Sequence, residues 1–332
     1  ARALQALTLA CIHWRGAEAL FTVSSRQRSL SLQDSSICAP LANRGTVFTI
    51  EVGVGTPPQR LELVVDSGSS RLVVPSCSCA ETGGCSQEAP CFQGRNASST
   101  FSIDRSPQGP RTVRISYLQG SVDGVAASDM VRLGNLSARV DGKLLLMTSS
   151  SLGSSAPGGI LGLGPPDSPD NQPSEAVVGG SAVGSRRASP LKGAISLWHI
   201  QTTIHSKKRD NTVPSPKPPR GFLQAAGVRR FSLCFRDGGP GALRLGEAVE
   251  PGALGIVDRR FWSVGLAGVS VGGGGPLAAL EAPLRSSGQG IRRHSAAVDS
   301  GTSTIEGPEE HVSALLAALC EQWPRCARNH SA

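Results

Sequence analysis

The chain has few aromatic residues and no long apolar run. Aromatic side chains make up 4% of its 332 residues, and Tyr117 is the only tyrosine. No stretch reaches the roughly 18 consecutive apolar residues that a membrane-spanning helix needs. We therefore expect a membrane anchor, if the protein has one, only in a C-terminal part missing from this sequence.

The sequence also lacks the basic stripe interleaved with aromatic residues that is typical of a nucleic-acid surface. Its formal net charge is +8, but the segment 165–230 alone carries ten Lys or Arg against four Asp or Glu. The excess charge therefore belongs mostly to one segment rather than to a binding face. We expect no nucleic-acid partner.

Metal sites and several catalytic arrangements are missing as well. The six His residues fall in no metal-ligand spacing, and no Ser-His-Asp or Cys-His pattern is apparent. Four of the nine cysteines crowd one stretch with a spacing that matches no common zinc pattern, which favours disulfides over zinc: Cys77, Cys79, Cys85 and Cys91. We expect no metal and no cofactor.

The cysteines and three sequons, at Asn96, Asn135 and Asn329, favour an oxidising compartment and a glycoprotein. We therefore expect the secretory pathway, in the endoplasmic reticulum or Golgi lumen, or secretion. The odd number of cysteines leaves one thiol unpaired, or paired outside this sequence.

What the chain does contain is short β-branched segments between turns rich in Gly and Pro, which predicts an all-β fold. Strand patterns run through residues 46–164, where they predict a hairpin from Thr112 to Gly134 and a strand from Lys143 to Met147, and return in residues 231–332. Residues 1–45 have the character of a leader or prosegment, and the short apolar stretch near their start suits either a signal remnant or a prosegment. Residues 165–230 are basic and rich in Pro, Ser and Gly, which indicates a surface insertion or unspliced sequence. The sequence predicts a helix at residues 309–319, where apolar residues recur at helical spacing.

An internal repeat carries the chemistry. An apolar strand leads into Asp66-Ser67-Gly68-Ser69-Ser70, and another leads into Asp299-Ser300-Gly301-Thr302-Ser303. A single Asp-Ser-Gly is ordinary turn chemistry, but two copies in the same frame are far harder to obtain by chance. Two carboxyl groups about 3 Å apart cannot both ionise, so they share one proton and supply a base and an acid for amide hydrolysis. The pattern predicts Asp66 and Asp299 as a catalytic pair.

The neighbours of the two aspartates suit that role. Gly68 and Gly301 let the backbone approach closely, and the hydroxyls of Ser69 and Thr302 can brace the loops.

On these motifs, the sequence resembles the pepsin-like aspartic proteases over residues 46–164 and 231–320. The resemblance implies a bilobal fold in which each β-lobe gives one Asp to a cleft, with residues 46–164 as the N-terminal catalytic lobe and residues 231–332 as part of the second. It also implies a flap hairpin carrying Tyr117 near Gly120, which closes over an extended peptide or protein substrate. The segment from Gly159 to Gly162 resembles the strand that threads behind the first active-site loop.

A narrower resemblance points to the plasmepsin V-type proteases of apicomplexan parasites. It rests on the cysteine-rich loop, the flap segment from Tyr117 to Ser121 and the helix ending in Cys320. Those enzymes cleave export cargo after an Arg-x-Leu motif, and Glu88 corresponds to one acid that receives the substrate Arg. Gln119 stands where the family has another acid, which weakens the expected selectivity for Arg.

The second lobe departs from the family, because only 29 residues follow Ser303. We expect a C-terminally truncated copy whose second lobe is incomplete. The sequence thus predicts a monomeric aspartic endopeptidase, a hydrolase that processes secretory or export cargo. The alternatives are a non-catalytic, protease-like peptide-binding protein and an inactive fragment of the protease.

Overall fold

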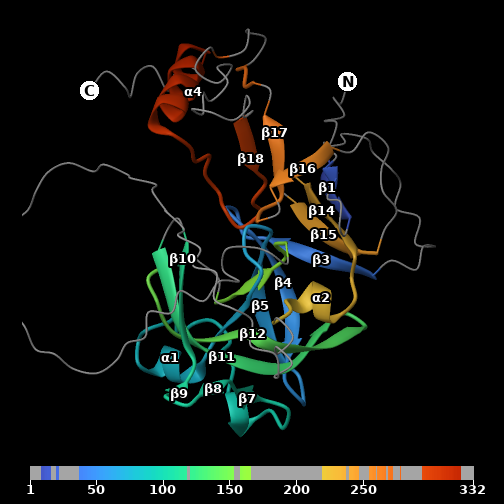
Figure 1. The fold of residues 1–332 in the computed structure, drawn as a ribbon, viewed down its shortest axis with the longest axis vertical. Coiled ribbons are helices and arrows are strands. Elements are labelled where there is room, and N and C mark those ends of the chain that lie inside the picture. The colour runs from blue at the N-terminus through green and yellow to red at the C-terminus, as the bar shows by residue number, and fades with distance from the viewer. Residues whose placement is uncertain are drawn as a thin grey trace, which may run out of the picture. The chain divides into compact units, whose positions relative to one another are not determined.

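The computed structural model describes residues 9–15, 20–21, 37–117, 120–152, 158–165, 219–236, 239–246, 254–258, 260–266, 268–271, 277 and 294–322. These residues are mostly strands, as Figure 1 shows, so the predicted all-β class is confirmed. The predictions for Gln119, for Asn329 and for most of the segment 165–230 concern residues outside the described part of the chain.

The largest sheet has twelve strands, and β7 (Ser102–Ile103) joins it on β11. In spatial order the other strands are β1 (Leu9–Arg15), β14 (Arg230–Arg236), β15 (Gly239–Leu245), β3 (Ile37–Asn43), β4 (Phe48–Val54), β5 (Gln59–Asp66), β13 (Ile160–Gly162), β6 (Leu72–Pro75), β12 (Leu136–Ser150), β11 (Gly120–Leu133) and β10 (Thr112–Tyr117).

A four-stranded sheet carries the second Asp-Ser-Gly segment at one of its edges. Its order is β18 (His294–Ala297), β17 (Ser263–Leu266), β16 (Leu254–Asp258) and β2 (Leu20–Phe21), and β8 (Arg105–Ser106) and β9 (Gly109–Pro110) form a separate pair. The helical segments are α1 (Cys77–Glu81), the 3-10 turn η1 (Gly94–Asn96), α2 (Phe222–Ala225) and α4 (Glu309–Gln322).

The strands around the first aspartate are buried on both faces. All four residues of β6 and all three of β13 are buried. β13 runs parallel to β5, and β12 runs parallel to β6. Parallel strands covered on both faces have continuous apolar sequences rather than alternating ones, which explains the runs Leu72-Val73-Val74 and Ile160-Leu161.

The predicted flap hairpin is confirmed. β10 pairs antiparallel with β11, and Tyr117 lies opposite Gly120 at the turn end of the hairpin. The sequence predicted only residues 143–147 of β12, whereas β12 continues from Leu136 to Ser150 along β11. The polar residues that β12 and β11 place on their outer face hid this length from the apolar pattern.

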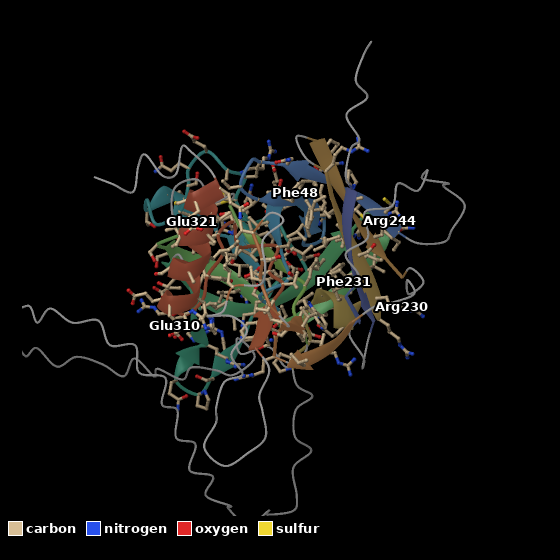
Figure 2. The ribbon with its side chains drawn as sticks, turned by 90° about the horizontal axis from the view of Figure 1, so that it is seen from above. Phe48, Arg230, Phe231, Arg244, Glu310 and Glu321 are labelled. Atoms are coloured by element: carbon tan, nitrogen blue, oxygen red, sulfur yellow. A yellow bond between two sulfur atoms is a disulfide. The ribbon has the colours of Figure 1, made fainter. Side chains whose placement is uncertain are left out.

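Part of the segment 165–230, which the sequence predicted to be an insertion, packs into the main core. Phe222 and Leu223 of α2 are buried there. Trp262 is buried in the same core, where its ring packs edge-on against Phe231 at 6.1 Å and its indole N–H donates to the Leu163 carbonyl at 2.9 Å. Figure 2 shows Phe231 toward the interior, with Arg230 and Arg244 at the edge.

The predicted helix at residues 309–319 is confirmed as α4. Pro308 precedes it, and the acids Glu309 and Glu310 occupy its first turn, where they suit the helix dipole. None of its residues is buried, and Figure 2 shows Glu310 and Glu321 along it. Among the described residues, no helix has the length and apolar character needed to cross a membrane.

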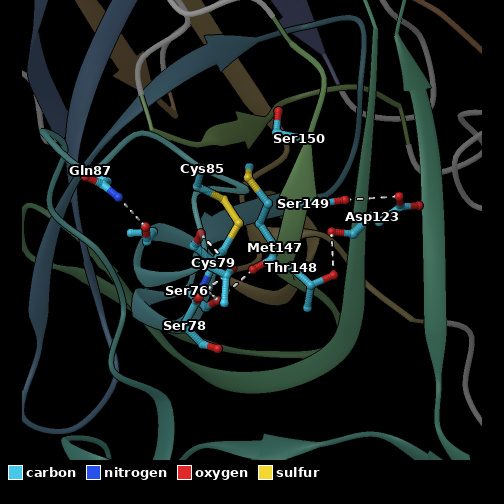
Figure 3. Close-up of a disulfide and its surroundings, with 12 residues drawn as sticks. Ser76, Ser78, Cys79, Cys85, Gln87, Asp123, Met147, Thr148, Ser149 and Ser150 are labelled. Atoms are coloured by element: carbon cyan, nitrogen blue, oxygen red, sulfur yellow. Dashed lines mark hydrogen bonds between the residues drawn. A yellow bond between two sulfur atoms is a disulfide. The ribbon is translucent and has the colours of Figure 1, made fainter.

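The cysteine-rich segment forms two disulfides, Cys77–Cys91 and Cys79–Cys85. These bonds use the four sulfurs that the zinc alternative required. Ser76 caps α1 by accepting a hydrogen bond from the Cys79 amide at 3.0 Å, and its hydroxyl donates to the Met147 carbonyl on β12 at 2.7 Å (Figure 3). The segment is therefore attached to the sheet beside the hairpin. Cys38 on β3 is an exposed free thiol.

Replacing Gly162 with Ala should destabilise the fold by about 1–3 kcal/mol, because overpacking forces backbone to move. A Cβ at Gly162 would lie 2.5 Å from the Arg71 carbonyl oxygen and 2.6 Å from its amide nitrogen. Urea unfolding measures the loss. Gly265→Ala is the control, since its nearest atom would be 3.8 Å away, and equal losses in both variants would contradict the prediction.

Candidate active site

The end of β5 holds Asp66 in place. β13 runs alongside it, with Gly162 opposite Asp66, and the Leu163 amide donates to the Asp66 carbonyl at 2.7 Å. Beyond the loop, the Gly164 amide donates to the Ser69 carbonyl at 2.6 Å. The segment that the sequence predicted behind this loop therefore holds the loop at both of its ends, at Asp66 and at Ser69.

Asp299 follows β18, whose register on β17 pairs Ala297 with Ser263. The Val298 amide donates to the Trp262 carbonyl at 2.9 Å, which continues the pairing to the residue before Asp299. Asp66 is thus the last residue of a hydrogen-bonded strand and Asp299 lies two residues beyond one, where backbone geometry is well defined.

The two Asp-Ser-Gly loops are joined by four hydrogen bonds, which form two equivalent pairs. The Ser67 amide donates to Ser300 Oγ at 3.0 Å, and the Ser300 amide donates to Ser67 Oγ at 2.9 Å. Ser67 Oγ in turn donates to the Val298 carbonyl at 2.9 Å, and Ser300 Oγ donates to the Val65 carbonyl at 2.7 Å. Each serine is therefore both donor and acceptor across the junction.

Ser67 and Ser300 were missed as site residues by the sequence reasoning. Their signal was visible, since both repeats carry Ser directly after Asp. Only the fold shows that each hydroxyl reaches the opposite loop.

Within each loop, two donors hold the carboxylate in the same way. The Gly68 amide donates to Asp66 Oδ1 at 2.8 Å, and Ser69 Oγ donates to Asp66 Oδ2. In the other loop the Gly301 amide donates to Asp299 Oδ1 at 2.8 Å, and Thr302 Oγ1 donates to Asp299 Oδ2 at 2.8 Å. The four predicted supporting residues therefore contact the carboxylates directly.

The two glycines bring the carboxyl groups together. A Cβ at Gly68 would lie 2.5 Å from Asp299 Oδ2, and one at Gly301 would lie 2.5 Å from Asp66 Oδ1. Each glycine thus faces the carboxylate of the opposite loop, and any larger residue would separate the pair.

The pKa of Asp66 is raised from 3.8 to about 8, first of all by burial and then by the neighbouring charge of Asp299 and a hydrogen bond with it. The hydrogen bonds from Ser69 and the Gly68 amide act in the opposite direction and lower this pKa. Asp66 is 5% exposed and Asp299 is half-buried. Two carboxyl groups in contact titrate as a pair and hold one proton between them over a wide pH range.

The other predicted site residues lie near the hairpin and the cysteine loop. Tyr117, half-buried at the end of β10, packs against a second core cluster that includes Val73 and Cys79. Gly120 begins β11, and Glu88 is exposed between Cys85 and Cys91. The closure of Tyr117 over substrate and the contact of Glu88 with a substrate Arg stay predictions.

In comparisons with known proteins, residues 47–178 match the family model described as eukaryotic aspartyl protease. Procardosin-B of Cynara cardunculus is 34% identical over 110 residues, 33% of this chain and 20% of the relative. Napsin-A of Homo sapiens is 27% identical over 291 residues, 86% of this chain and 57% of the relative. Pregnancy-associated glycoprotein 2 of Bos taurus is 34% identical over 136 residues, 40% of this chain and 34% of the relative.

The family match covers residues 47–178 and so includes the first Asp-Ser-Gly loop. The chain spans between 20% and 57% of the length of these three relatives. Since the three come from a plant and two mammals, the narrower apicomplexan resemblance stays a prediction.

Asp66→Asn should raise the stability of the protein near neutral pH. A carboxyl whose pKa rises from 3.8 to about 8 on folding binds its proton more tightly in the folded state. Its contribution to stability is complete below about pH 4 and falls by up to about 1.4 kcal/mol per pH unit as the pH rises toward 8.

Thermal unfolding between pH 4 and pH 8 measures this effect. The gap between Asp66→Asn and the unchanged protein should widen with pH, whereas Asp141→Asn, at an exposed carboxyl, should leave the profile as it is. A gap that stays constant from pH 4 to pH 8 would mean that Asp66 does not titrate as described.

Proposed function

We propose that this chain, whose residues 47–178 are similar to eukaryotic aspartyl proteases, forms part of an aspartic endopeptidase that hydrolyses peptide bonds. The observation that carries the proposal is the contact between the Asp66 and Asp299 carboxyl groups, each held by one backbone N–H and one hydroxyl. Structural carboxylates usually pair with cations, whereas here two acids face each other, which is expected where one proton must be shared.

In the proposed reaction, the pair begins with one proton. The ionised carboxylate removes a proton from a water molecule as its oxygen bonds to the peptide carbonyl carbon, and the protonated carboxyl gives its proton to the carbonyl oxygen. The C–N bond then breaks as the amide nitrogen receives a proton from the pair and one hydroxyl of the diol intermediate returns its proton to the pair. A carboxylic acid and an amine leave, and the pair again holds one proton.

The environments of the two carboxyl groups favour different starting roles. Asp66 is the more deeply buried, and burial favours its neutral form. We infer that Asp66 carries the shared proton when substrate arrives and that Asp299 is the base.

The proposed substrate is an extended peptide that lies along the β10–β11 hairpin. An extended peptide can pair its backbone with such a hairpin, while side-chain pockets set specificity. Tyr117 and Gly120, at the turn end of the hairpin, are the residues proposed to cover the peptide. Gly68 and Gly301 leave room beside the carboxyl groups, whereas Ser69 and Thr302 brace them.

The narrower proposal concerns cargo and compartment. The exposed carboxylate of Glu88, together with Gln119, is proposed to select basic side chains in secretory or export cargo. Two disulfides within fifteen residues suit an oxidising lumen. We accordingly propose the secretory pathway or secretion as the location.

The catalytic proposal is tested by peptide hydrolysis at mildly acidic pH, with a version of the protein extended to the full length of its relatives. Asp66→Asn and Asp299→Asn should each lower kcat by at least about 100-fold, because each removes an acid–base group. Asp141→Asn is the matched control and should retain full turnover. If either active-site variant keeps its turnover, the assigned roles fail, and peptide binding without cleavage by the unchanged protein would favour the non-catalytic alternative.

The compartment is tested through the sequon at Asn135. Asn135 is exposed in the turn between β11 and β12, next to Gly134 with its φ of 57°, so a glycan there would meet solvent. When the protein is secreted from eukaryotic cells, Asn135→Gln and Ser137→Ala should each lower its mass by one glycan. Unchanged mass in both variants would contradict glycosylation at this site.

A further inference from the structure

Two cationic side chains are almost wholly buried behind the Asp66 loop. Arg71 and Lys143 are each 2% exposed, and both are among the largest fully buried side chains. Burying a charge is unfavourable unless polar groups receive it, and apolar residues usually fill such positions at lower cost. Their presence here calls for a role that an apolar side chain would not serve.

The two cations make reciprocal contacts between two chain segments. Lys143 Nζ donates to Ser70 Oγ at 3.1 Å, and Arg71 Nη1 donates to the Gly142 carbonyl at 3.3 Å. The parallel pairing of β12 with β6 starts one residue later, at Leu144 opposite Leu72. Each segment therefore contributes one side chain that donates a hydrogen bond to the other segment, just before the residues at which β12 and β6 begin to pair.

One side of this arrangement is the catalytic loop itself. Ser69, whose hydroxyl donates to Asp66 Oδ2, directly precedes Ser70 and Arg71. The Gly162 amide donates to the Arg71 carbonyl at 2.9 Å, so β13 holds the same segment from behind. A displacement of residues 70–71 would therefore move the Ser69 hydroxyl away from the Asp66 carboxyl.

The other side is anchored independently of the loop. The Gly142 amide donates to Ser128 Oγ at 3.0 Å, and Ser128 Oγ donates to Asp104 Oδ1 at 3.1 Å. Gly142 has a φ of +67°, and a Cβ there would lie 2.9 Å from Asp104 Oδ2. The partner of Arg71 is thus a fixed backbone position on β12.

We propose that Arg71 and Lys143 are positioning residues for Asp66: they hold residues 70–71 so that the Ser69 hydroxyl, which favours the ionised form of Asp66, stays on the carboxyl. The proposal rests on the proposed function for its kinetic consequences, but its effect on the proton affinity of the pair does not require turnover.

The charged surroundings of the loop support this assignment. Both acidic and basic side chains lie on the elements packed around it. In the described part of the chain the acids are Glu51 on β4, Glu62 on β5, Asp104 before β8, Asp123 and Asp129 on β11, Asp141 on β12 and Asp299 after β18. The bases are Arg60 on β5, Arg71 before β6, Arg132 on β11, Arg139 and Lys143 on β12, and Arg220 before α2. Of these, Asp299, Arg71 and Lys143 are joined to the loop by the contacts above. Asp299 opposes ionisation of Asp66, and the Ser69 hydroxyl next to residues 70–71 favours it.

Lys143→Met tests the proposal, because it keeps most of the stem and removes the charge and the bond to Ser70. We expect kcat to fall by about 10- to 100-fold, as for other small misplacements of a catalytic group, with KM changed less than about twofold. The alkaline limb of the pH–rate profile, where Asp66 loses the shared proton, should move to higher pH. Arg71→Lys, which keeps a buried cation, should retain more activity than Arg71→Met.

A second measurement works without substrate. The pH range over which Asp66 weakens stability, identified as the part of the profile that Asp66→Asn abolishes, should move upward by roughly half a pH unit in Lys143→Met. If the unchanged protein cleaves nothing but this midpoint moves, the proposed function fails and the positioning role stands.

Ser70→Ala removes the acceptor of Lys143 while leaving the charge, and it serves where Lys143→Met does not fold. It should move the midpoint in the same direction, by less. A folded variant, Lys143→Met or Ser70→Ala, with an unchanged midpoint and an unchanged kcat would overturn the proposal.

Discussion

The site depends on the four hydrogen bonds that join Ser67 and Ser300 to the opposite loop. Two carboxyl groups brought together out of water repel each other once both ionise, so their contact must be held by something else. The serine hydroxyls provide this, because each one accepts from an amide and donates to a carbonyl of the other segment. The joined residues are 233 apart in sequence, so the contact ties distant parts of the chain at the point where the proposed chemistry occurs.

The bracing of the pair is symmetric, while its burial is not. Each carboxylate receives one N–H and one hydroxyl, but Asp66 is buried and Asp299 is half-buried. The hydrogen bonds hold both groups in the same way, and the deeper burial of Asp66 favours its neutral form. Acid and base roles can therefore differ in two loops of nearly identical sequence.

Several elements were predictable because local chemistry determines them. The strands ending at Asp66 and Ala297, the hairpin carrying Tyr117 and the helix α4 all follow from alternation, apolar runs or capping. Elements that depend on distant partners were missed: the full length of β12, the helix α1 within the disulfide loops, and the burial of Phe222 and Leu223. A four-residue helix after a Pro- and Lys-rich stretch has no local signal, since its stability comes from the core it joins.

By itself, the sequence determined the two Asp-Ser-Gly repeats, the glycines that allow close approach and the hydroxyls three residues beyond each aspartate, because these are choices of residue type at short spacing. Only the tertiary structure decided that Ser67 and Ser300 exchange hydrogen bonds, that each glycine faces the opposite carboxylate, and that Arg71 and Lys143 lie buried behind the loop. Contacts between residues far apart in the chain depend on how sheets assemble around a shared core. Residue type and local spacing carry no record of that assembly, so a buried lysine and an exposed one look the same in the sequence.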